Sequence, residues 1–115
     1  MTVMPGNAQH IGSREEQQDA FAFSDVSDKK FIRHGGVLAV LADGMGGLAD
    51  GKAASTLAVR TLMKEYEAKS KTESVPDALA RSVLRANGEV NEMARASAME
   101  GNIGTTIAAA VVHQD

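Results

Sequence analysis

The side chains that could act on a charged substrate are Arg14, Asp19 and Asp43. Asp43 follows six apolar residues (37–42) and precedes a Gly-Met-Gly-Gly run (44–47). A turn so rich in glycine lets carbonyl oxygens approach a ligand closely beside a carboxylate. Mg²⁺ and Mn²⁺ prefer oxygen ligands, so this stretch fits a divalent-cation site. The spacing leaves one alternative open, in which Asp43 caps the helix that follows.

Arg14 and Asp19 belong to a polar stretch, 13–19, that ends where the apolar residues 20–23 begin. Asp19 is therefore expected where a loop enters a strand, and an irregular turn before it could direct both side chains into one cleft. A guanidinium offers a planar fork of donors that suits phosphate oxygens. The residues alone also allow a plainer interpretation, in which Arg14 forms a surface ion pair with Glu15 or Glu16.

The elements that must position these residues follow from the spacing of apolar side chains. Residues 37–42 and 105–112 have the length and apolar content of buried strands. Between them, apolar residues recur at helical intervals over 48–69 and again after Ser74, which is placed to cap a second helix. The segment 24–30 is expected to be a hairpin-like connection. This order predicts an α+β fold with a helix pair packed on one face of a sheet.

Composition narrows the class of protein further. A length of 115 residues with 43% hydrophobic content predicts a single domain or part of one. The net charge of −3 does not favour binding to nucleic acid or to an anionic membrane, so neither partner is expected. No cysteine is present to act as a nucleophile or metal ligand, which fits a reducing cytoplasm. The longest apolar run is far shorter than the ~20 residues of a membrane-spanning helix, so a soluble cytoplasmic protein is expected.

Three blocks of the sequence resemble the signature of the metal-dependent serine/threonine protein phosphatases, the type 2C class, in its bacterial form. In chain order they are 12–20 (GSREEQQDA), 43–47 with 51–55 (DGMGG and GKAAS), and 102–106 (NIGTT). The resemblance covers the amino-terminal half of the family's domain, so residues 1–115 are expected to be the amino-terminal portion of one phosphatase domain. It implies part of a four-layer sandwich of antiparallel β-sheets flanked by helix pairs.

The resemblance also implies a chemistry and assigns roles in it. Two Mg²⁺ or Mn²⁺ ions in the family's complete site activate a water that attacks phosphoserine or phosphothreonine of a signalling phosphoprotein. By this resemblance, Asp43 would bridge the two ions and the Gly44 carbonyl would coordinate one of them. Asp19 would hold a metal-bound water, and Arg14 would contact the substrate phosphate.

Some features depart from the family pattern. Leu48 and Lys52 stand where many members carry His and Glu, and the carboxylates that complete the second metal's shell come from the family's later half. The 115-residue chain alone is therefore expected to bind metal weakly and to have little or no activity. Half of a sandwich would also expose an apolar sheet face or edge, to be covered by self-association or by the missing carboxy-terminal half. The alternative function is a non-catalytic, phosphatase-like interaction module.

Overall fold

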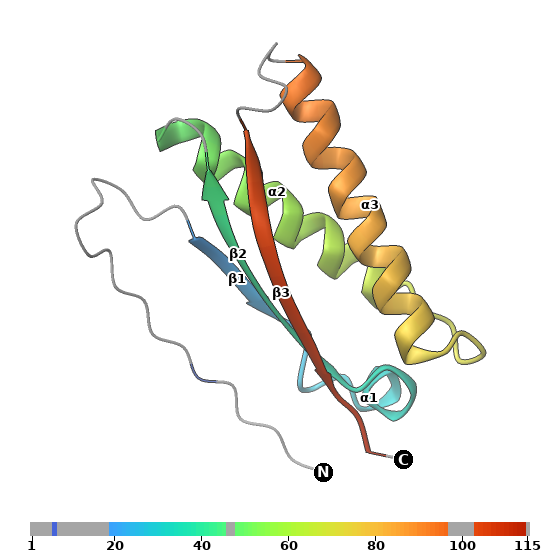
Figure 1. Ribbon diagram of the computed structural model, residues 1–115. Coiled ribbons are helices and arrows are strands. Elements are labelled where there is room, and N and C mark those ends of the chain that lie inside the picture. Colours follow the sequence, from blue (N-terminus) through green and yellow to red (C-terminus); the bar gives the residue numbers. More distant parts are fainter. Residues whose placement is uncertain (1–5, 7–18, 46–47, 97–102, 115) are drawn as a thin grey trace.

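A computed structural model describes residues 6, 19–45, 48–96 and 103–114 of the chain (Figure 1). The described elements, in chain order, are β1 (Asp19–Phe23), α1 (Lys29–Gly35), β2 (Val37–Met45), α2 (Leu48–Glu67), α3 (Val75–Ala96) and β3 (Gly104–Val112). The strands form one antiparallel sheet in the order β1-β2-β3. Helices α2 and α3 pack together on one face of it (Figure 1). The predicted α+β fold is confirmed, with a sheet and a helix pair as two of the layers expected of the sandwich.

Strand β2 is the centre of the sheet and is apolar on both faces. Leu38, Val40 and Ala42 point toward the helices and are at most 3% exposed. Leu41 points to the other face, where it is 47% exposed. Strands that are apolar on both faces are typical of sheets covered on both sides. Among the described residues, this sheet is covered on the helix side only.

We call the uncovered side the open face. Its side chains alternate with those that face the helices, and the register of the three strands places them opposite one another. The apolar side chains at the middle of the open face are Phe21, Phe23, Ala39, Leu41, Ala108 and Ala110. The expectation of an exposed apolar sheet face is therefore met in the described part of the chain.

Helix α2 packs against both the sheet and α3. A stripe along it is fully buried and consists of Ala54, Ala58, Leu62 and Tyr66. On α3 the buried side chains are also mostly small, which allows the two helices to approach closely. In the described ranges, neither helix is long and apolar enough to cross a membrane.

Helix α1 was not predicted. The sequence predicted a hairpin-like connection over 24–30, but a helix begins at Lys29. The side chain of Asp28 caps α1 by accepting a hydrogen bond from the backbone N–H of Phe31 at 3.1 Å. The helix ends at Gly35, and the residue that caps it, Gly36, has a φ of 65°, which favours glycine. The buried Tyr66 hydroxyl donates to the Gly35 carbonyl oxygen at 2.7 Å. A helix of seven residues is too short to show a periodic pattern, and these tertiary contacts stabilise it.

Candidate active site at the strand ends

Asp19 and Asp43 are direct partners in the antiparallel ladder between β1 and β2. Directly opposite residues place their side chains on the same face of a sheet, with Cβ atoms about 5 Å apart. The register therefore brings together the two carboxylates that the sequence predicted to share a site. One oxygen of Asp19, Oδ1, is buried. Like charges directly opposite each other destabilise a sheet, and a bound cation between them would offset that cost.

Gly44 lies in β2, and the glycine-rich turn expected to begin at Asp43 does not begin there. The strand continues to Met45, and among the glycines of the described residues a positive φ occurs at Gly36 alone. Gly44 is needed for a different reason, because a Cβ at this position would lie 1.8 Å from the carbonyl oxygen of Gly51. The first turn of α2 thus packs directly on the strand end that carries Asp43. Coordination of a metal by the Gly44 carbonyl stays a prediction.

Lys52 belongs to this site, and the sequence had marked it only as a departure from the family pattern. Its ammonium group donates a hydrogen bond to the backbone carbonyl oxygen of Asp19 at 2.6 Å. This bond joins α2 to the first residue of β1. It fixes the backbone that carries Asp19 and brings a positive charge to the end of the sheet where the two carboxylates lie.

The donor atoms at this end of the sheet are oxygens. Thr106, the partner of Asp43 on β3, adds a hydroxyl whose Oγ1 is 3.5 Å from the Asp43 carbonyl oxygen. Carboxylate, carbonyl and hydroxyl oxygens suit Mg²⁺ or Mn²⁺ better than softer metals. Within the described ranges, no three His, Asp or Glu side chains gather to hold a metal ion. The acidic pair therefore fits one part of a divalent-cation site.

Arg14 lies outside the described residues. Its expected contact with a substrate phosphate therefore stays a prediction.

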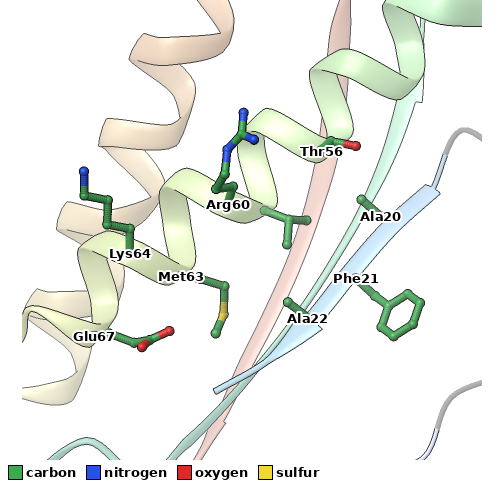
Figure 2. Close-up of a pocket in the computed structure, with 9 residues that line it drawn as sticks. Ala20, Phe21, Ala22, Thr56, Arg60, Met63, Lys64 and Glu67 are labelled. Carbon is green, nitrogen blue, oxygen red and sulfur yellow. The ribbon is translucent and has the colours of Figure 1, made fainter. Parts of the chain in front are cut away.

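A separate hollow of about 600 Å³ lies between β1 and α2 (Figure 2). Figure 2 shows Met63 directed toward β1, while Arg60 and Lys64 extend away from it. Its remaining lining is Ala20, Phe21, Ala22, Thr56, Val59 and Glu67. Since its inner lining is apolar and its charged groups do not converge, this hollow has no arrangement suited to catalysis.

Comparison with known proteins bears on the family and the fold of the chain. A family model described as protein phosphatase 2C matches residues 7–115. The serine/threonine phosphatase PstP/Ppp of Mycobacterium tuberculosis is similar in structure, with a TM-score of 0.65 and 24% identity over 87% of this chain and 37% of that chain. A mutant bacterial serine phosphatase has a TM-score of 0.69 and 25% identity over 91% of this chain and 46% of that chain. This chain thus spans less than half the length of either. No curated protein matches it significantly.

Proposed function

Because the chain belongs to the protein phosphatase 2C family, we propose that it forms part of a metal-dependent protein serine/threonine phosphatase. The observation that carries this proposal is the register pairing of Asp19 with Asp43 at one end of the sheet. These are the carboxylates that the family resemblance places in the metal site. Two carboxylates on one face of a sheet can both direct oxygens toward one divalent cation, which prefers oxygen ligands.

The proposed roles follow from the chemistry of each group. Asp43 and the Gly44 carbonyl hold the cation, and Asp19 orients a water by accepting its hydrogen bond. Arg14 binds phosphate oxygens through its planar donors. When bound there, Mg²⁺ or Mn²⁺ would supply positive charge that lowers the pKa of a water and offsets charge on the phosphoryl group. This chemistry needs no cysteine nucleophile, and the chain contains none.

We also propose that the substrate is a phosphoprotein and that further acidic ligands complete the site. The described residues provide two carboxylates there, and the chain spans 37% and 46% of the two similar structures. The rest of the family's domain is the proposed source of the missing ligands. The same part of the domain is proposed to cover the open face, on which Phe21 is 40% exposed and Leu41 is 47% exposed.

A second candidate function is a non-catalytic module that binds phosphoproteins or another subunit. The absence of a third acidic or histidine ligand among the described residues favours it. Both candidates use the same fold, and they differ in whether the chain supports catalysis.

The proposal is tested by titrating the purified chain with Mn²⁺ and following its thermal unfolding. If free Mn²⁺ exceeds its dissociation constant tenfold, the native state gains about 1.4 kcal/mol. Asp43→Asn should abolish this gain. Glu67→Gln removes the same charge from an exposed position of α2 and should leave the gain intact.

The result that would overturn the metal site is a wild-type unfolding midpoint that Mn²⁺ does not change. Hydrolysis of p-nitrophenyl phosphate by the same samples then tests the non-catalytic alternative. Little or no hydrolysis is expected from the 115-residue chain. Mn²⁺-dependent hydrolysis that Asp43→Asn removes would show that this chain is active alone and would exclude the non-catalytic module.

A further inference from the structure

A second cluster of charged side chains lies at the opposite end of the strands from Asp19 and Asp43. It surrounds a cavity of about 400 Å³ lined by Lys30, Arg33, His34 and Lys71. The first three belong to α1, which joins the end of β1 to the start of β2, at the lower end of the molecule in Figure 1. Asp43 lies six residue steps along β2 from Val37, so the two sites are roughly 20 Å apart.

Among the described residues, the cations of this cavity lack the acidic partners that the arginines of α3 have. Arg81, Arg85 and Arg95 each form ion pairs with glutamates. In the described part of the chain, no carboxylate forms an ion pair with the cavity cations. The nearby Asp28 already accepts a hydrogen bond from the backbone of Phe31 as the cap of α1.

Lys69 adds a buried positive charge beside the cavity. It is only 5% exposed, and its ammonium group contacts Nδ1 of His34 at 3.3 Å and the Ser70 carbonyl oxygen at 3.0 Å. A nearby anion favours the imidazolium form of His34, in which both ring nitrogens donate. Burial of a cation is costly. The carboxylate of Glu73 feels the charge of Lys69 but is already bound to Arg81, so an anion bound in the cavity would offset part of that cost.

Stabilisation of α1 accounts for only part of the cluster. Arg33 and His34 stand in the last turn of α1, where the helix dipole favours cations. Lys30 stands in its first turn, where the dipole disfavours a cation, and Lys71 comes from the segment between α2 and α3. An anion in the cavity would be complementary to all four.

We propose that this cavity binds a phosphate-type oxyanion, a tetrahedral group with about two negative charges. Lysine and arginine are the side chains that most often bind phosphate oxygens, and arginine does so through two parallel N–H donors. The anion is either free inorganic phosphate or the phosphoryl group of a phosphorylated peptide. The site is independent of the metal chemistry, because it lies at the other end of the strands.

Two titrations at constant ionic strength test the proposal, one with inorganic phosphate and one with a phosphoserine peptide. NMR of the His34 ring should show saturable binding and a rise in its pKa, because a bound anion favours the imidazolium form. The double variant Lys30→Gln/Arg33→Gln should bind about tenfold more weakly. Lys29→Gln removes a charge from the exposed neighbour on α1 that does not line the cavity, and should bind like the wild type.

Saturable binding of either titrant that the double variant weakens supports the site, and the titrant that binds identifies the source of the anion. The proposal is overturned if neither titrant binds. It is also overturned if Lys29→Gln weakens binding as much as the double variant does, since the effect would then reflect net charge. Thermal unfolding of each variant shows that it is folded in the titration.

Discussion

The backbone of Gly44 at the end of β2 lies directly against the backbone of Gly51 in the first turn of α2. A Cβ on Gly44 would come within 1.8 Å of the Gly51 carbonyl oxygen. This approach sets how closely the helix packs on the strand end that carries Asp43. The approach also explains why residue 44 is a glycine although its φ is not positive.

Gly44→Ala should lower the free energy of unfolding by about 3 kcal/mol, because a backbone oxygen cannot move aside as a flexible side chain could. Urea denaturation of the purified variant measures this. Gly88→Ala is the matched control, since Gly88 lies in α3 with nothing within 4 Å of the added Cβ. It should raise the free energy of unfolding by roughly 0.5–1 kcal/mol. Equal stability of the two variants would show that the close contact is absent.

Lys52→Met should loosen the start of β1, because the Asp19 carbonyl oxygen loses its 2.6 Å hydrogen bond from the ammonium group. The expected loss of stability is about 1 kcal/mol, since Lys52 is only partly buried. Hydrogen exchange of the amides in β1 should accelerate more than that of the amides in β3. Unchanged exchange throughout β1 would mean that this bond does not position Asp19. Lys64→Met, at an exposed position of α2, serves as the control for loss of a lysine.

We expect the open face to favour self-association of the chain, and Leu41→Gln should reduce it, because Leu41 is 47% exposed in the middle of this face. Sedimentation velocity over a range of concentrations measures the effect. Leu84→Gln is the control, because Leu84 is even more exposed, at 71%, but lies on α3. Exposed apolar surface on a sheet favours association more than an isolated side chain on a helix does. If both variants reduced association equally, general hydrophobicity and not the open face would be responsible.

The stability of the fold should decrease as the pH falls below about 6.5, because burial lowers the pKa of His34 below that ordinary value. The charges of Lys69, Lys71 and His113 also lower the pKa of His34, and Asp28 acts in the opposite direction. Between the two pKa values the unfolded chain binds a proton that the folded chain does not. Stability therefore rises with pH in this range and is lost as the pH falls through the folded pKa.

His34→Gln tests this assignment, because it removes the titrating group while keeping a polar side chain. The slope of unfolding free energy against pH should be smaller in the variant than in the wild type below pH ~6.5. Identical slopes would assign the pH dependence to other groups. Lys30 and Arg33 line the same cavity, so added phosphate should raise the pKa of His34 and reduce the wild-type slope.

Much of the fold follows from patterns within single segments. The strand over 37–42, the strand over 105–112 and both long helices were predicted from the spacing of apolar residues, and the structure confirms each of them. The family was predicted from three short blocks, and its model matches residues 7–115. Asp19 was expected at the start of a strand and is the first residue of β1.

The site depended on contacts between distant segments. The pairing of Asp19 with Asp43 is a matter of strand register, and the Lys52 bond and the Gly44 contact both depend on how α2 packs on the sheet. The predicted turn beginning at Asp43 was wrong, because β2 continues through Gly44. Gly44 is needed for the close approach of α2 and not for an unusual φ. The role of Arg14 stays a prediction.

By itself, the sequence determined the two long helices, the two apolar strands and the family, because hydrophobic periodicity and short motifs are properties of neighbouring residues. Only the tertiary structure decided helix α1, the strand register and the basic cavity. Each of these depends on contacts between residues that are far apart in the chain. Patterns among neighbouring residues do not show which distant residues come into contact.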